Sequence, residues 1–202
     1  MRLIGLCGRS GSGKSECGRI IADMGIAVID TDSVYRRLTQ RGSELLGALA
    51  GFFGEHILDA SGNLDRKRLA QLVFGDDRLL SRLNEITHKH IIKGVIEQAG
   101  RVEAHSREGL VVVQAPLLFE SGFDKKCEIT ICVVASDNHC INRLRIRDSI
   151  TEEQARIRLS KQKDNSFLER NCDYIIINNE DFGYLKQRTE EVLGEVLRRV
   201  VK

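Results

Sequence analysis

The chain has 202 residues, of which 42% are hydrophobic and 30% charged, and its formal net charge is +2. This length suits one compact domain with a modest insertion, and the composition is that of an ordinary globular protein. The small net charge argues against binding nucleic acid through bulk electrostatics, so an anionic ligand would depend on locally placed positive charge.

The first residues and the cysteines indicate the cellular compartment in which we expect the protein. Residues 3–7 are apolar but too few for the core of a signal peptide, and no apolar run reaches the roughly 18 residues of a membrane-spanning helix. Six cysteines occur without a Cys-x-x-Cys pair, which favours reduced, mostly buried thiols over a metal site. We expect a cytoplasmic protein with no membrane partner.

Short apolar runs alternate with longer helical stretches, a pattern typical of a parallel sheet covered by helices. Five runs predict strands, at residues 3–7, 26–29, 110–113, 129–134 and 174–177. Their β-branched character suits strands that are buried on both faces. The expected fold is α/β, with three layers and a five-stranded, mostly parallel sheet.

Two long segments between the strands lack strand character. Apolar residues at helical spacing, beginning at Leu45, predict a helical insertion over residues 39–108. A polar helical stretch, residues 138–170, separates the last two strands, and an amphipathic helix over 181–201 closes the chain. The core of this single domain is expected at residues 1–38, 109–137 and 171–202.

Residues 8–15 read Gly-Arg-Ser-Gly-Ser-Gly-Lys-Ser and fit the G-x-x-x-x-G-K-[ST] pattern of a phosphate-binding loop. A predicted strand precedes them and a helical stretch follows, as the motif requires. Lys14 would reach the β- and γ-phosphates, and the Ser15 hydroxyl would coordinate Mg²⁺. The expected nucleotide-binding residues of the loop are Gly8, Gly11, Ser12, Gly13, Lys14, Ser15 and Glu16.

A dinucleotide-binding loop is the main alternative, because Gly11-x-Gly13 also follows a strand. The third glycine of that motif would fall on Glu16, and the motif has no role for Lys14 or Ser15. A nucleoside triphosphate is therefore the predicted ligand.

Two carboxylates, Asp30 and Asp32, follow the second predicted strand. Ligands of open α/β folds lie outside the carboxyl ends of the strands, so a carboxylate here could accept the proton of an attacking hydroxyl or help to hold the metal. Thr31 or Asp32 could instead cap the next helix, and both roles could hold for different residues.

The segment before the last strand is basic. Its cationic side chains are Arg143, Arg145, Arg147, Arg156, Arg158, Lys161 and Lys163. Phosphoryl transfer needs positive charge from a segment that closes over the nucleotide, although a solvated helix face neutralised by Glu152 and Glu153 explains most of these residues. Arg143 and Arg147, which share a helix face, are the candidates for phosphate contact.

These segments together resemble the dephospho-coenzyme A kinases. The resemblance runs in order through residues 8–15, 28–32, 62–66, 83–88 (Leu-Asn-x-x-x-His), 116–120 (Pro-Leu-Leu-Phe-Glu), 143–148 and 173–178. It implies a P-loop kinase with a helical CoA-binding insertion and a lid, using ATP and Mg²⁺. The implied reaction, the last step of coenzyme A biosynthesis, transfers the γ-phosphate to the 3′-hydroxyl of dephospho-CoA.

The resemblance also implies roles for single residues. Asp32 would be the base for the hydroxyl, with Lys14, Arg143 and Arg147 as the other catalytic residues, and Asn178 would lie near the adenine. The implied acceptor-binding residues are Asp32, Arg66, His88, Leu118 and Glu120. The sequence departs from the family's usual residues at Arg9 (glycine), Cys140 (glutamine) and Cys172 (alanine).

Two other functions stay open on the residues alone. The chain could be a P-loop kinase of another nucleotide or nucleoside, or a non-catalytic regulator that binds nucleotide. The sequence does not indicate an oligomeric state.

Overall fold

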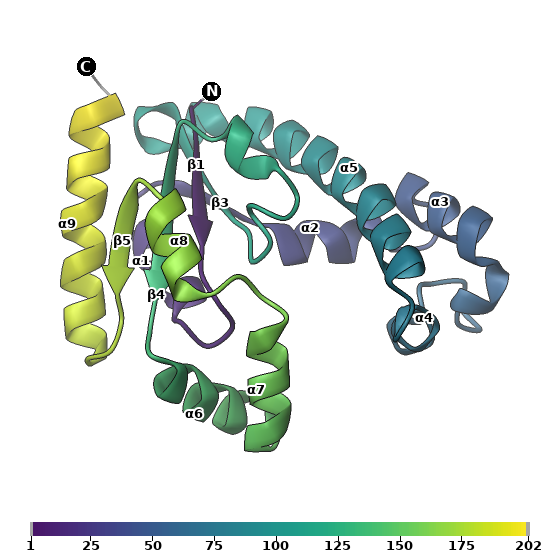
Figure 1. Ribbon diagram of the computed structural model, residues 1–202. Coiled ribbons are helices and arrows are strands. Elements are labelled where there is room, and N and C mark those ends of the chain that lie inside the picture. Colours follow the sequence, from purple (N-terminus) through teal and green to yellow (C-terminus); the bar gives the residue numbers. More distant parts are fainter. Residues whose placement is uncertain (1, 201–202) are drawn as a thin grey trace. The chain divides into compact units, whose positions relative to one another are not determined.

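The computed structural model describes residues 2–200, and within them five strands form one sheet (Figure 1). The strands are β1 (Arg2–Cys7), β2 (Ala27–Asp30), β3 (Leu110–Gln114), β4 (Ile129–Val134) and β5 (Tyr174–Ile177), in the order β2-β3-β1-β4-β5. β1 pairs in parallel with β3 and β4, and β4 pairs in parallel with β5. The predicted α/β fold is confirmed, and each strand begins and ends within one residue of its predicted bounds.

The helices follow the predicted alternation with strands. They are α1 (Lys14–Asp23), α2 (Thr31–Leu38), α3 (Glu44–Phe53), α4 (Arg66–Val73), α5 (Asp77–Val102), α6 (Asp137–Asp148), α7 (Glu152–Ser160), α8 (Asn165–Asn171) and α9 (Phe182–Val200). Short 3₁₀ turns are η1 (Glu55–Ile57), η2 (Glu103–His105), η3 (Arg107–Gly109) and η4 (Phe123–Lys126). The predicted end of the last helix, residue 201, lies outside the described residues.

Alternate residues of the central strand β1 face opposite sides of the sheet. Ile4 and Leu6 are fully buried and belong to one apolar cluster with α1 and α9, which cover that face of the sheet. Gly5 and Cys7 point to the opposite face, because successive side chains of a strand alternate. There Gly5 lies against Leu118, so the sheet is enclosed between two further layers as predicted.

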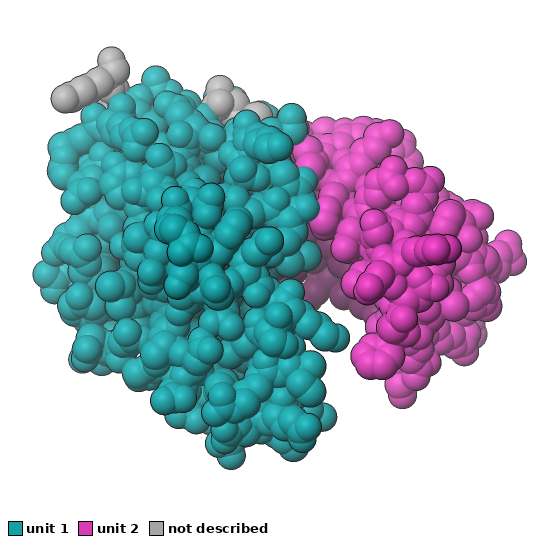
Figure 2. Space-filling view, viewed as in Figure 1, with its two compact units in different colours: residues 1–29, 99–202 teal, residues 30–98 magenta. Residues whose placement is uncertain are grey.

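The chain forms two compact units, Met1–Ile29 with Ala99–Lys202, and Asp30–Gln98 (Figure 2). The first unit contains the sheet. The second is helical and has a separate apolar core, composed of Leu45, Leu46, Leu49, Phe53, Ile57, Leu64, Leu69 and Val73. The insertion predicted at 39–108 overlaps this second unit over residues 39–98.

The polar stretch at 138–170 folds as helices rather than as an extended loop. α6 and α7 pack together through a small core that includes Cys140, Leu144, Ala155 and Leu159. Ser136 caps α6, and Thr151 caps α7 in a capping box with Gln154. Few apolar side chains therefore hold α6 and α7 together.

Candidate functional site

The phosphate-binding loop connects β1 to α1 at the carboxyl end of the central strand (Figure 1). Gly13 is the N-cap of α1 and has a left-handed backbone, with φ 99° and ψ 9°, which glycine adopts without strain. A glycine has no side chain to cap the first amides of the helix. The N-terminus of α1 therefore keeps the amide groups and the partial positive charge that bind an anion.

The glycines of the loop lie where any side chain would collide with a neighbouring segment, and Gly11 and Gly13 show this for the residues that pack against the loop. A Cβ on Gly11 would lie 2.6 Å from the carbonyl oxygen of Cys140 in α6, and one on Gly13 would lie 2.1 Å from Nδ2 of Asn178. Both distances are far below van der Waals contact. α6 and the residue after β5 thus pack directly against the loop backbone.

Arg143 and Asn178 meet at this backbone. Nη1 of Arg143 donates to the carbonyl oxygens of Gly11 and Ser12, at 3.2 and 3.4 Å. Its Nη2 donates to the carbonyl oxygen of Asn178 at 3.2 Å, and Nδ2 of Asn178 donates to the Ser12 carbonyl at 2.7 Å. Asn178 is 4% exposed. These two predicted site residues therefore hold the loop by its carbonyl groups.

The residues after Gly13 present the charged and hydroxyl groups of the motif. Lys14 is half-buried, whereas Ser15 is exposed. Oγ of Ser15 accepts a hydrogen bond from Nε2 of Gln114 at 3.5 Å. Glu16 forms an ion pair with Arg19 at 2.6 Å on the surface of α1. The loop therefore offers a cation and a hydroxyl next to the helix N-terminus.

Gln114 is a site residue that the sequence prediction missed. It is the last residue of β3 and only 8% exposed, and a Cβ on Gly18 of α1 would lie 2.4 Å from its Oε1. The signal was available in the sequence. A polar residue that ends a buried apolar strand lies at the edge of the sheet where ligands bind.

Arg9 ties the loop to α6 and α7. Its side chain is 8% exposed, and Nη1 lies 2.5 Å from Oδ1 of Asp137. Its Nη2 donates to the carbonyl oxygen of Leu159 at 3.3 Å. Beside it, the amide of Ser10 donates to Oε1 of Gln162 at 2.9 Å. The structure thus accommodates the bulk of an arginine in the loop by burying it against α6 and α7.

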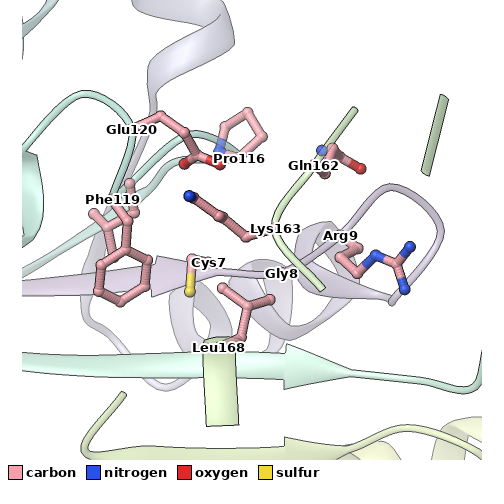
Figure 3. A pocket seen from close by; sticks show the side chains of 10 residues that line it. Cys7, Gly8, Arg9, Pro116, Phe119, Glu120, Gln162, Lys163 and Leu168 are labelled. Atoms are coloured by element: carbon pink, nitrogen blue, oxygen red, sulfur yellow. The ribbon is translucent and has the colours of Figure 1, made fainter. Parts of the chain in front are cut away.

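A small pocket lies beside the start of the loop (Figure 3). Its lining consists of Cys7, Gly8, Arg9, Pro116, Leu118, Phe119, Glu120, Gln162, Lys163 and Leu168. Figure 3 shows the amine of Lys163 directed toward the carboxylate of Glu120. Its volume of about 10 Å³ leaves room for about one water molecule, so the pocket as it stands is too small for a nucleotide. Leu118 is fully buried and Glu120 exposed.

Arg147 has a different partner from Arg143. Its guanidinium contacts the carboxylate of Asp148 at 2.7 and 2.8 Å, and Arg158 reaches the same carboxylate at 2.7 Å. The hydrogen bonds from Arg147 are the main reason why the pKa of Asp148 is lowered. Glu152 pairs with Arg156 at 2.7 Å. Much of the basic stretch is therefore a solvated, ion-paired surface.

Asp30 and Asp32 have separate positions at the end of β2. Asp30 is the N-cap of α2, and its carboxylate accepts from the amide of Ser33 at 3.3 Å and from its hydroxyl at 2.9 Å. The prediction that Thr31 or Asp32 would provide a cap is wrong, because β2 continues to Asp30 and α2 begins at the next residue. Asp32 lies in the first turn of α2 and is exposed.

Two further predicted residues belong to the second unit, Asp30–Gln98. Arg66 opens α4, with its guanidinium 5.2 Å from the ring centroid of Tyr35 and its Nη2 donating to Oγ1 of Thr39 at 3.2 Å. His88 is half-buried in α5. Arg66 thus stacks as a cation on an aromatic ring of its own unit.

Residues 2–200 contain no helix that is long and apolar enough to cross a membrane. Within the same range, no three or more histidine, cysteine and carboxylate side chains are grouped so that they could hold a metal ion.

Fold and loop together define a P-loop kinase. A crystal structure of the TT1252 protein of Thermus thermophilus superimposes with a TM-score of 0.81 and 28% identity, covering 96% of this chain and 97% of that one. The structure of a dephospho-CoA kinase of Campylobacter jejuni superimposes with a TM-score of 0.70 and 24% identity, covering 97% of this chain and 98% of that one. A shikimate kinase of Acinetobacter baumannii shares the fold, with a TM-score of 0.57 at 17% identity over 100% of this chain and 96% of that one.

Sequence comparison identifies the family within this class. The dephospho-CoA kinase family model matches residues 2–183. The dephospho-CoA kinase of Lactobacillus johnsonii is 32% identical over 195 residues, 96% of this chain and 98% of its own. That of Arabidopsis thaliana is 35% identical over 198 residues, 98% of this chain and 85% of its own. The chain belongs to the dephospho-CoA kinase family, and the predicted resemblance is confirmed.

Proposed function

We propose that this chain transfers the γ-phosphate of ATP to the 3′-hydroxyl of dephospho-CoA and releases CoA and ADP. The observation that carries the proposal is the phosphate-binding loop at the N-terminus of α1, in a chain that matches the family over nearly its whole length. The loop presents Lys14, Ser15 and uncapped helix amides, which are the groups that hold a triphosphate.

The loop is held in place before any nucleotide arrives. The carbonyl groups of Gly11 and Ser12 are bound by Arg143 and Asn178, and the amides at the N-terminus of α1 are the proposed donors toward a phosphate. Donors fixed in advance stabilise the developing charge of the transition state without reorganising during the reaction. In this proposal Arg143 acts through the loop, Lys14 contacts the β- and γ-phosphates, and Asn178 supports the nucleotide side of the site.

Magnesium fits the oxygen groups of this site. The exposed hydroxyl of Ser15 would be its protein ligand, and the buried carboxamide of Gln114 would orient that hydroxyl. A bound ion would supply positive charge that offsets the negative charge of the phosphates. Arg147 would add positive charge from α6 if it exchanged Asp148 for a phosphate.

Asp32 is the proposed base. Because Asp30 caps α2, the carboxylate of Asp32 is not needed for capping and remains exposed. It would accept the proton of the attacking 3′-hydroxyl, a role that contributes about 10²- to 10⁴-fold to the rate. Arg66 and His88, together with Leu118 and Glu120, are the proposed acceptor-binding residues.

The direct test is the formation of CoA from ATP and dephospho-CoA, followed by mass spectrometry. Failure to form CoA while another nucleotide or nucleoside is phosphorylated would favour the first alternative. ATP binding without turnover of any acceptor would favour a non-catalytic regulator. The Lys14→Ala variant should lose activity and ATP affinity while keeping its fold, whereas the matched variant of an exposed lysine, Lys126→Ala, should behave as wild type.

A second pair of variants tests the base. Asp32→Ala should lower kcat by about 10²-fold or more with little change in ATP affinity. Asp23→Ala, which removes an exposed carboxylate at the end of α1, is the control and should keep wild-type turnover. Unchanged turnover in Asp32→Ala would show that the base is misassigned.

A further inference from the structure

Three cysteines gather beneath the phosphate-binding loop. Cys7 is the last residue of β1, and Cys132 is its parallel partner in β4. Cys172 lies between α8 and β5, and its Sγ is 3.5 Å from Sγ of Cys7. Cys7 and Cys132 are 1% and 0% exposed, whereas Cys172 is half-buried. Phosphoryl transfer as proposed above makes no use of these thiols.

The three thiols are chemically unequal. Hydrogen bonds from Cys132 and Cys7 are the main causes that lower the pKa of the Cys172 thiol, and Thr130 adds to them against the opposing effect of burial. The same contacts with Cys172, together with burial, raise the pKa of Cys7 and of Cys132. Cys172 is thus the thiol that ionises first and the one that solvent reaches. A low pKa, solvent access and a neighbouring thiol are the features of cysteines that react with oxidants.

We propose that Cys172 and Cys7 form a reversible disulfide that switches off nucleotide binding at the loop. This regulation rests on the function proposed above. The site is proposed as a modification site.

The oxidant in this proposal is a hydroperoxide, and hydrogen peroxide is the simplest member of that class. The Cys172 thiolate attacks one oxygen of the peroxide and breaks the O–O bond, which gives a sulfenic acid and, after protonation, one water. The Cys7 thiol then attacks the sulfenic sulfur, forms the S–S bond and releases a second water. Two thiols are oxidised by two electrons and one peroxide is reduced. A dithiol reverses the step by thiol–disulfide exchange.

Cys7 is the proposed partner of Cys172 because their sulfurs lie 3.5 Å apart. Cys7 is held by the hydrogen-bond ladder of β1 and β4, and Cys172 is held as the C-cap of α8, where its amide donates to the carbonyl oxygen of Leu168 at 3.0 Å. A disulfide needs an S–S distance of about 2.05 Å, so the two sulfurs must approach by about 1.5 Å from their present separation. Within residues 2–200, the remaining cysteines, Cys17, Cys127 and Cys140, make no such contact with this pair.

The approach of the sulfurs displaces the start of the loop. Cys7 is followed directly by Gly8, where a Cβ would lie 2.5 Å from the carbonyl oxygen of Val133, so the backbone there is closely packed and cannot shift without cost. A displacement of about 1 Å in a phosphoryl-transfer site costs on the order of 10²-fold in rate. We expect oxidation to lower kcat/KM for ATP by about 10- to 100-fold.

The experiment uses the full chain treated with hydrogen peroxide and then divided into samples with and without dithiothreitol. Non-reducing peptide mapping should show one peptide pair joined through Cys7 and Cys172. Affinity for a fluorescent ATP analogue should fall about tenfold, as expected for the loss of one or two phosphate hydrogen bonds, and return with dithiothreitol. Cys172→Ala should bind nucleotide normally and lose this response, and Cys172→Ser serves if the alanine variant folds poorly.

The control is Cys127→Ala, which removes another half-buried thiol and should respond to peroxide as wild type does. A disulfide that joins Cys132 or two chains, or an unchanged nucleotide affinity in the oxidised protein, overturns the proposal. So does an equal loss of affinity in oxidised Cys172→Ala. Because the readouts are a covalent bond and nucleotide affinity, they do not require dephospho-CoA. If no CoA forms but both readouts respond, the reaction is misassigned and the switch stands.

Discussion

Arg143 contacts backbone carbonyl groups of the loop, and its replacement by alanine tests whether it acts as a support. The side chain makes hydrogen bonds at 3.2, 3.4 and 3.2 Å to the carbonyl groups of Gly11, Ser12 and Asn178. A hydrogen bond from a charged donor contributes about 1.5–3 kcal/mol at good geometry. These three are at or beyond the long end of the usual range, so we take about 1 kcal/mol each, or about 3 kcal/mol in total.

A loss of about 3 kcal/mol lowers Tm by about 6–12 °C for a chain of this size. Differential scanning fluorimetry without nucleotide measures this shift, and isothermal titration calorimetry measures the accompanying loss of ATP affinity. Arg143→Lys should recover only part of the lost stability, because one ammonium group cannot reach all three carbonyl groups. Arg145→Ala removes an exposed arginine of the same helix and should change stability by less than about 0.5 kcal/mol.

The reasoning fails if Arg143→Ala keeps the wild-type Tm without nucleotide. A large fall in kcat at unchanged Tm would show that the guanidinium leaves the carbonyl groups and acts on the phosphates directly. A fall in Tm together with weaker ATP binding supports the role as a brace for the loop.

Three further variants test other contacts. Burial opposes ionisation of Asp173, but hydrogen bonds from Thr130 outweigh it and lower the pKa below its ordinary value of 3.8. The carboxylate therefore stabilises the fold above about pH 4, and this contribution is lost as pH falls through the lowered pKa. In urea titrations Asp173→Asn should have a lower free energy of unfolding than wild type at pH 7, and this difference should shrink in acid. A difference that does not change with pH contradicts the stabilising role of the Asp173 carboxylate. Arg9→Gly should lower the free energy of unfolding by about 1–2 kcal/mol and reduce hydrogen-exchange protection in α7. Unchanged hydrogen exchange in α7 contradicts the role of the Arg9 contacts. Gln114→Glu, by placing a carboxylate beside Ser15, should lower the Mg²⁺ concentration for half-maximal activity by about fivefold; an unchanged requirement contradicts the proposed metal position.

The strands and the loop were predictable because each is specified by local sequence. A continuous apolar run such as residues 129–134 predicts a strand buried on both faces, and the structure contains that strand with the same bounds. The loop needs only a strand, its glycines and a helix in succession. Neither prediction requires knowledge of distant residues.

The direction of the Arg143 side chain was not predictable from helical spacing. Spacing of i and i+4 places Arg143 and Arg147 on one face of α6, but it does not determine what each guanidinium meets. The close approach of α6 to Gly11 brings carbonyl groups to Arg143, whereas Arg147 lies next to Asp148 in sequence and pairs with it. The partners of Arg9 could not be predicted for the same reason, because they belong to helices more than a hundred residues away.

The end of β2 shows how one residue changes an assignment. The apolar pattern ends at Ile29, so Thr31 or Asp32 is the alternative candidate for the cap of the next helix. The strand includes Asp30 and the helix follows without a connecting turn, which makes Asp30 the cap. Strand and helix boundaries depend on backbone pairing and not only on side-chain polarity.

The contacts that hold the loop also determine when it can form during synthesis. The loop occupies residues 8–15, but Arg143 and Asn178 follow Gly11 and Ser12 by 132 and 166 residues in the chain. At about 5–20 residues per second, a ribosome needs roughly 10–30 s to add the intervening residues. The loop is therefore synthesised well before the residues that brace it, and it gains these contacts only once β5 and Asn178 have been added to the chain.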